Sequence, residues 1–132
     1  MDSLDNTIYP PLINAARSGH VEVVRVLLEG GADVERVNAI QDTALHAAAY
    51  FGYLEVCRLL LDWGAKVDRM DKWSDTPLHV AARWDLFAAV QLLVERGADV
   101  RLKINNGQAA SDLAHSEVKK DVAEWLGLVS RG

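Results

Sequence analysis

The chain contains Thr43-Ala44-Leu45-His46-Ala47-Ala48-Ala49 and, 33 residues later, Thr76-Pro77-Leu78-His79-Val80-Ala81-Ala82. The same step relates three further sets of positions: Gly31-Ala32, Gly64-Ala65 and Gly97-Ala98; Leu12, Leu45 and Leu78; and the doublets Leu27-Leu28, Leu60-Leu61 and Leu93-Val94. A spacing that several residue types keep over three copies indicates an internal repeat, and a repeat of this length is typical of stacked helical units.

Each copy has the pattern of two short helices followed by an extended turn. In the second copy, Thr43 is the predicted N-cap of a helix over residues 44–50. Gly52 ends that helix, because glycine readily takes the left-handed conformation that a helix end needs. A second helix is predicted over residues 54–62, and Gly64-Ala65 stops it. In the third copy Pro77 takes the first helical position, where its missing N–H costs nothing.

One such helix pair has too little apolar surface to fold alone, so the units must stack and share a continuous core. The alanine pairs of the first helices allow close approach between units, and the bulkier Leu and Val residues fill the side of the second helices. This asymmetry predicts a curved stack whose concave side is formed by the first helices and the turns. The predicted fold class is all-α, a solenoid of helix-turn-helix units joined by protruding turns.

These motifs resemble the ankyrin repeat. The similarity lies in the Thr-Pro-Leu-His segment at 76–79, its variant at 43–46, and the segments Gly31-Ala32-Asp33-Val34 and Gly97-Ala98-Asp99-Val100. The resemblance covers roughly residues 5–126 and implies one domain over 1–132 with four units, at about 5–37, 38–70, 71–103 and 104–126. The first and last units depart most from the pattern and are interpreted as capping units.

Three departures concern backbone conformation. Gln41 and Ser74 stand where the family usually has a turn-tip glycine, which only Gly107 keeps. Asp85 replaces the glycine between the two helices of its unit, a change that a left-handed position tolerates. These substitutions leave the detailed turn geometry open and do not alter the predicted fold.

Composition narrows the function classes. The 132 residues are 50% hydrophobic and 25% charged, with a formal net charge of −5, which is typical of a folded soluble domain and unlike a nucleic-acid-binding surface. Cys57 is the single cysteine, so no internal disulfide can form. The acidic N-terminus is unlike a signal peptide, and no apolar run could span a membrane. The expected location is cytoplasmic or nuclear.

No arrangement of residues indicates catalysis, a cofactor or a metal site, so we expect the chain not to be an enzyme. His46 and His79 lie one repeat apart, roughly 10 Å, which is too far to share a metal ion. In the ankyrin-repeat family the equivalent histidine holds its own turn through a hydrogen bond to the backbone of the neighbouring repeat or to the threonine. Cys57 is expected to be a small buried hydrophobe. Asp42 and Asp75 are expected to lie on exposed turn tips, without an enclosed pocket that could shift a pKa.

The resemblance implies that a partner protein would contact the turn tips and the concave ends of the first helices, so that the chain acts as an adaptor or scaffold. The corresponding positions are Tyr9, Arg17, Ile40, Asp42, Tyr50, Phe51, Met70, Lys72, Trp73, Asp75, Arg83, Trp84, Asn106 and Gln108. Five of the nine aromatic residues fall among them, and aromatic residues dominate binding hot spots.

The cations Arg17, Arg69, Lys72 and Arg83 flank these rings, which favours a partner with an apolar centre and some acidic groups. The structural alternative is that Phe51 and Trp84 pack on the next unit and Trp73 packs on Ile40. Three other functions are weighed against partner binding: a homodimer formed through the apolar strip, an engineered repeat binder, and nucleic-acid binding through the basic row Arg36, Arg69, Arg101 and Lys103. The net acidity argues against the last.

Overall fold

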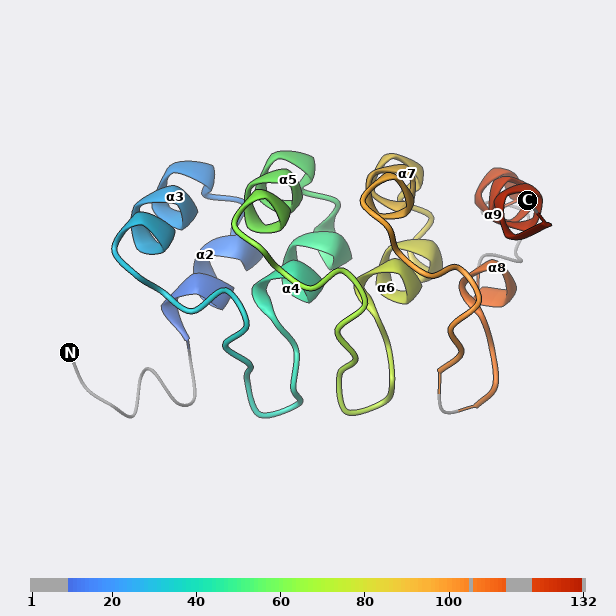
Figure 1. Cartoon of the computed structure of the whole chain (residues 1–132), viewed down its shortest axis with the longest axis horizontal. Coiled ribbons are helices and arrows are strands. Elements are labelled where there is room, and N and C mark those ends of the chain that lie inside the picture. Colours follow the sequence, from blue (N-terminus) through green and yellow to red (C-terminus); the bar gives the residue numbers. More distant parts are fainter. Residues whose placement is uncertain (1–9, 105, 114–119, 132) are drawn as a thin grey trace.

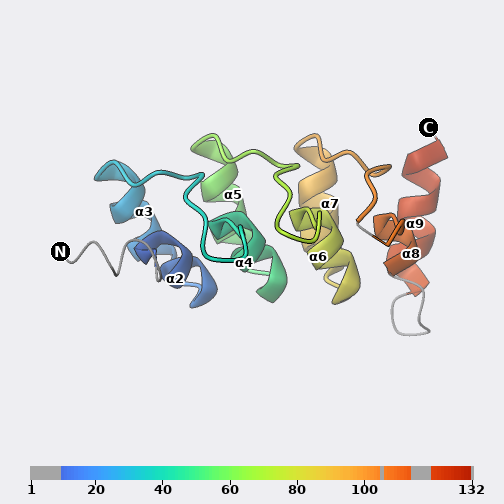
Figure 2. The same cartoon turned by 90° about the horizontal axis from the view of Figure 1, so that it is seen from below.

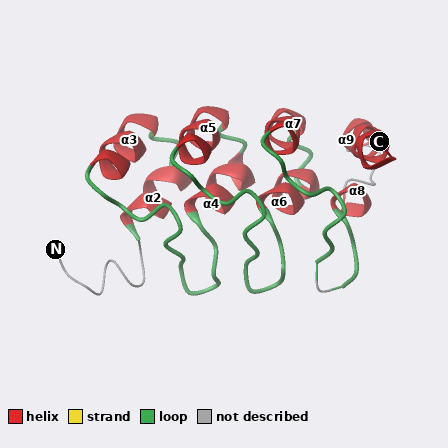
Figure 3. Ribbon diagram, viewed as in Figure 1, coloured by secondary structure: helices red, strands yellow, loops and turns green. Residues whose placement is uncertain are grey.

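Pairs of short helices joined by long loops make up the chain (Figure 1; Figure 3). The computed structural model describes residues 10–104, 106–113 and 120–131. In these ranges the helices are α2 (Pro11–Arg17), α3 (Val21–Glu29), α4 (Ala44–Phe51), α5 (Leu54–Asp62), α6 (Pro77–Arg83), α7 (Phe87–Glu95), α8 (Ala110–Leu113) and α9 (Lys120–Arg131). The same ranges contain no strand, and Lys103 and Ala109 form one isolated antiparallel bridge.

The helices form two rows. Figure 1 shows α2, α4, α6 and α8 in one row and α3, α5, α7 and α9 in the other, with neighbouring pairs in contact along the stack. The loops between units extend beyond the first row as protruding turns, and Figure 2 looks onto that side. This arrangement confirms the predicted all-α solenoid. The last helix runs to Arg131, beyond residue 126, where the sequence placed the end of the fourth unit.

A reciprocal cap begins each of the two central first helices. The His46 backbone N–H donates to the Thr43 hydroxyl at 3.4 Å, and the Thr43 backbone N–H donates to His46 Nδ1 at 3.1 Å. Thr76 and His79 make the same pair of bonds at 3.3 and 3.2 Å. These bonds satisfy backbone donors that a helix start leaves free. The predicted N-cap at Thr43 and the predicted place of Pro77 in the first turn are confirmed.

The same two histidines connect each unit to the next one along the chain. His46 Nε2 donates to the Asp75 carbonyl oxygen and His79 Nε2 donates to the Leu102 carbonyl oxygen, both at 2.8 Å. Because Nδ1 accepts from a backbone N–H, the ring proton must be on Nε2 and both rings are neutral. We call this pair of contacts the histidine tether. The tether predicted from the sequence is confirmed, with both the threonine and the neighbouring backbone as partners.

The core follows the predicted division of side chains. The alanine pairs of α4 and α6 are fully buried between first helices, and leucines such as Leu60 and Leu93 are fully buried on the second helices. Cys57 lies in this core, and burial raises the pKa of its thiol to about 12, so it remains a protonated, inert hydrophobe. Within the described ranges every helix is too short or too polar to cross a bilayer.

The outer face of the first unit differs from those of the internal units. Val23 and Val26 on α3 are 49% and 64% exposed, whereas Val56 and Leu59, one repeat later on α5, are buried. The end of the stack at α3 therefore presents apolar side chains at positions that the following units bury.

Left-handed residues occur at the expected places. Asp85 has φ 58°, like the glycine at position 52 with φ 71°, so the predicted tolerance at this position is confirmed. Gln41 and Ser74 have φ 64° and 65° at the turn tips, where Gly107 has φ 86°. A side chain at such a position costs roughly 1–2 kcal/mol through contact of its Cβ with the following carbonyl oxygen.

Replacing Gln41 by glycine should stabilise the chain. The relieved strain exceeds the extra entropy that glycine gives the unfolded state, roughly 0.4–1 kcal/mol. We expect Gln41→Gly to raise the free energy of unfolding by about 0.5–1 kcal/mol in urea titrations. Gly107→Ala is the reciprocal control, since open space surrounds its added Cβ, and should lower stability by a similar amount. A less stable Gln41→Gly chain would contradict this account of the turns.

Candidate protein-binding groove

A groove of about 550 Å³ opens between the first helices and the turns of the second and third units. We call it the central groove; it is lined by Arg17, Ile40, Asp42, His46, Ala47, Tyr50, Phe51, Asp71, Trp73, Asp75, Val80, Arg83 and Trp84. Nine of the positions predicted to meet a partner are among them: Arg17, Ile40, Asp42, Tyr50, Phe51, Trp73, Asp75, Arg83 and Trp84. The repeat therefore brings together residues that are up to 67 positions apart in the sequence.

Aromatic side chains form one wall of the central groove. The ring of Tyr50 meets Phe51 edge-on at 4.8 Å between centroids, and it meets Trp84 of the next unit at 5.2 Å. Phe51 also stacks on Tyr53 at 5.6 Å. Trp84 therefore packs on the preceding unit and Phe51 on rings of its own unit, whereas the structural alternative placed both against the next unit. Tyr50, Phe51, Trp73 and Trp84 all remain between 43% and 51% exposed. The rings thus support one another and still present apolar surface to solvent.

Two side chains near the start of the turns fold the backbone back on itself. Asp71 Oδ1 accepts hydrogen bonds from the backbone N–H groups of Trp73 at 2.9 Å and Asp75 at 3.0 Å. One repeat earlier, Asn38 Oδ1 accepts from Ile40 and Asp42, each at 3.0 Å. Such side-chain bonds to the residues just ahead are the usual reason for Asn and Asp in turns.

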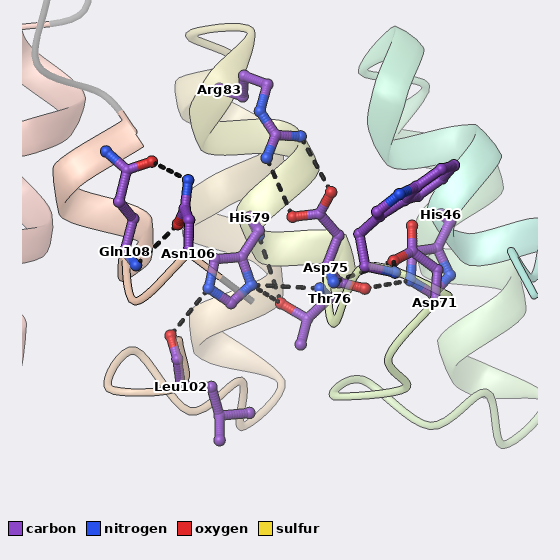
Figure 4. Close-up of polar contacts among 10 residues, drawn as sticks. His46, Asp71, Asp75, Thr76, His79, Arg83, Leu102, Asn106 and Gln108 are labelled. Atoms are coloured by element: carbon purple, nitrogen blue, oxygen red, sulfur yellow. Dashed lines mark hydrogen bonds and ion pairs between the residues drawn. The ribbon is translucent and has the colours of Figure 1, made fainter. Parts of the chain in front are cut away.

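The expectation that Asp42 and Asp75 lie on exposed tips without a pocket is wrong. Asp75 is buried and Asp42 is partly buried, and both side chains line the central groove. The turns bring these two residues back towards the helices instead of out into water. Arg83 of α6 binds the Asp75 carboxylate with two nitrogens, at 3.0 and 3.2 Å (Figure 4). Paired donors of this kind make a geometrically specific ion pair.

Asp42 has an unusual protonation state. Burial, a hydrogen bond to Asp71, and the charges of Asp71 and Asp75 together raise its pKa from 3.8 to about 7. Two carboxyl groups can hydrogen-bond to each other only if one holds a proton. Because Asp71 already accepts two backbone N–H bonds, the shared proton belongs on Asp42. Near pH 7 the Asp42 carboxyl is therefore only partly ionised.

A metal ion at this acidic cluster would compete with the fold. Asp42, His46 and Asp71 bring potential ligand atoms within 4.8 Å of one another. However, His46 uses Nδ1 for Thr43 and Nε2 for the Asp75 carbonyl. Coordination by His46 would therefore break either the helix cap or the histidine tether. The arrangement is better suited to holding the turns in place than to binding metal.

Four further predicted positions, which the structure describes, lie outside the central groove. Met70, at the end of the second unit, and Lys72, at the start of the third, are exposed and lie outside the groove. Asn106 and Gln108 pair with each other on the next turn, at 2.8 Å (Figure 4). Tyr9 lies outside the described residues. Arg69, expected as part of a cationic flank, is bound to Glu35 at 3.1 Å.

Sequence reasoning missed four residues that line the central groove: His46, Ala47, Asp71 and Val80. Of these, Asp71 carried a readable signal. It stands one repeat after Asn38, and both are residue types that bond to the turn ahead of them. Trp125 packs against Phe87 at 5.6 Å and against the core, whereas Trp63 lies at the end of α5 with 46% of its surface exposed.

Comparison with known proteins gives two family matches and one relative. The family described as ankyrin repeats (3 copies) matches residues 1–71, and the single ankyrin repeat matches residues 74–106. A stretch of 49 residues is 45% identical to part of Dauer abnormal formation protein 25 of Caenorhabditis elegans. That stretch covers 37% of this chain and 13% of the relative.

Removing the Asp42 carboxyl should stabilise the chain in a pH-dependent way. Because the folded-state pKa lies above the unfolded value, Asp42 favours folding below pH 3.8, and this contribution is lost as the pH rises towards 7. Relative to wild type, Asp42→Asn should therefore gain stability between pH 5 and pH 8. We expect a gain on the order of 1 kcal/mol at pH 8, allowing for screening by solvent at the open groove.

The matched control is Glu29→Gln, which removes one carboxylate from the exposed end of α3, outside the groove. Its stability relative to wild type should not change between the two pH values in urea titrations. An equal effect of Asp42→Asn at pH 5 and pH 8 would show that Asp42 titrates as an ordinary surface carboxyl.

Proposed function

Because this chain belongs to the ankyrin-repeat family, whose members are generally protein–protein interaction modules, we propose that it is an adaptor or scaffold that binds a partner protein through the central groove. The turn tips next to the groove, with Met70, Lys72, Asn106 and Gln108, would form the rim of that interface. The relative from Caenorhabditis elegans shares too short a stretch to suggest which partner this is.

The observation that carries the proposal is the gathering of half-exposed rings at one place. Tyr50, Phe51 and Trp84 touch one another, and Trp73 lines the same groove from the turn. The solenoid does not need large rings at these positions, and each ring left in water forgoes about 1.5–3 kcal/mol of burial. Aromatic clusters beside polar groups are typical of the centres of binding interfaces.

The proposal also covers catalysis and location. Ankyrin-repeat proteins are generally not enzymes, and we extend this to the present chain. The open groove, in which the histidine ring is committed to the fold, supports that view. A cytoplasmic or nuclear location remains our expectation, supported by a single cysteine that is buried and reduced.

The proposed interface can be tested by comparative capture from a cell extract with mass spectrometry. The bait variants are Trp73→Ala and Trp84→Ala, which remove rings that line the groove. Trp63→Ala is a matched control, because it removes a ring of similar exposure at the far end of α5. We expect a specific set of proteins to bind wild type and Trp63→Ala, and binding to fall at least about tenfold for the two groove variants, the usual effect of a hot-spot ring.

Circular dichroism should first show that each variant is folded, and sedimentation should show whether the captured ligand is a second copy of the chain. Equal loss with all three tryptophan variants, or unchanged capture by the groove variants, would mean that the central groove is not the interface.

A further inference from the structure

The acidic groups of the central groove are only partly neutralised. Three carboxyl groups, those of Asp42, Asp71 and Asp75, line it, and Arg83 is paired with Asp75. In the part of the chain that the structure describes, no lysine or arginine forms an ion pair with Asp42 or Asp71. The Asp42–Asp71 pair is thus an acidic site in an open groove, and no described lysine or arginine is paired with it.

Aromatic rings line the same groove. The faces of such rings carry negative potential and attract cations placed over them, most strongly with tryptophan. Tyr50 and Trp84 hold each other at 5.2 Å from two different units, and both remain about half exposed. A ligand group that enters the groove would therefore meet carboxyl oxygens and ring faces together.

We propose that the central groove recognises an arginine side chain on an extended, otherwise apolar segment of the partner, with the guanidinium on the Asp42–Asp71 pair and its flat face against the rings of Tyr50 and Trp84. This inference rests on the proposed function, and it names the chemistry of the partner. It differs from the acidic partner expected from the sequence, because two of the four flanking cations, Arg83 and Arg69, are already bound to Asp75 and Glu35.

A guanidinium fits this groove better than an ammonium does. It is planar and weakly hydrated, it can bond two oxygens at once, and it stacks on aromatic faces. The groove already contains one such contact, in which Arg83 binds both oxygens of Asp75 at 3.0 and 3.2 Å. The second arginine of the groove, Arg17, is exposed on α2 of the first unit, and no ion pair joins it to Asp42 or Asp71 among the described residues.

Binding of the cation should release a proton. The charged and titratable groups that line the groove with Asp42 are Asp71, Asp75, His46, Tyr50, Arg83 and Arg17. Among these, His46 is neutral through its hydrogen bonds and Arg83 balances Asp75, so Asp42 is the group that can lose a proton when a guanidinium arrives. The affinity for a cationic segment should consequently rise between pH 6 and pH 8.

Capped peptides of the sequence Gly-Leu-Arg-Leu-Gly can test the proposal directly. The comparison peptides carry citrulline, the neutral analogue of arginine, or lysine or glutamate at the central position. Binding is followed by NMR of the protein, using the indole N–H signals of Trp73 and Trp84, with that of Trp63 as the signal outside the groove. We expect the arginine peptide to bind at least about tenfold more tightly than the citrulline peptide, the lysine peptide to fall between them, and the glutamate peptide to bind weakest.

Variants locate the effect. Asp42→Asn should reduce the preference for arginine over citrulline to below about threefold and remove the rise in affinity with pH. Glu29→Gln makes the same change in net charge outside the groove. It should leave both the preference for arginine over citrulline and the rise in affinity with pH unchanged. The wild-type comparison of arginine with citrulline needs no variant, so the test stands even if Asp42→Asn lowers the yield of folded protein.

The outcomes separate this inference from the proposed function. Equal binding of the arginine and citrulline peptides, with loss of both in Trp84→Ala, would overturn cation recognition and leave the groove as an apolar interface. Tighter binding of the glutamate peptide would overturn it in favour of an acidic partner. Failure of all four peptides to shift the groove signals would also overturn it, while the capture experiment would still decide the proposed function.

Discussion

The hydrogen bonds of two buried histidines hold the turns of this chain in place. Each imidazole caps its own helix through Nδ1 and reaches the next turn through Nε2, so one side chain fixes both the start of a helix and the position of the neighbouring unit. The central groove depends on these hydrogen bonds of His46. His46 holds the Asp75 carbonyl, the Asp75 N–H is bound by Asp71, and the Asp75 carboxylate holds Arg83 (Figure 4). Asp75 therefore belongs both to the contact that joins two units and to the lining of the central groove.

The tether needs neutral rings, which links it to pH. Burial is the main reason that the pKa of both histidines lies below 6.5. When the pH falls below 6.5, the two histidines take up protons in the unfolded chain but remain neutral in the folded chain. The contribution of the tether to stability is therefore complete above pH 6.5 and is lost as the pH falls further. Asp42 acts in the opposite sense, because its pKa is raised. The tether thus contributes most to stability at neutral pH and above, whereas the contribution of Asp42 is greatest in acid.

The sequence predicted the parts of the structure that depend on local chemistry and on the repeat. Thr43, Gly52 and Asp85 have the predicted caps and left-handed conformations. Stacking at a fixed step also brought most of the predicted surface positions into one groove. The environment of Asp42 and Asp75 could not be predicted in this way. It depends on how far the turn folds back, which Asp71 controls, and on the distance between units, which sets whether Tyr50 meets Trp84.

The most direct test of this account is NMR of the imidazole nitrogens of His46 and His79 in the ¹⁵N-labelled chain, from pH 8 down to the onset of unfolding. We expect both rings to be neutral with the proton on Nε2, and to stay so below pH 6.5 for as long as the chain is folded. Titration of either ring at its ordinary pKa in the folded chain, or a proton on Nδ1, would contradict the tether and the arrangement of turns that rests on it.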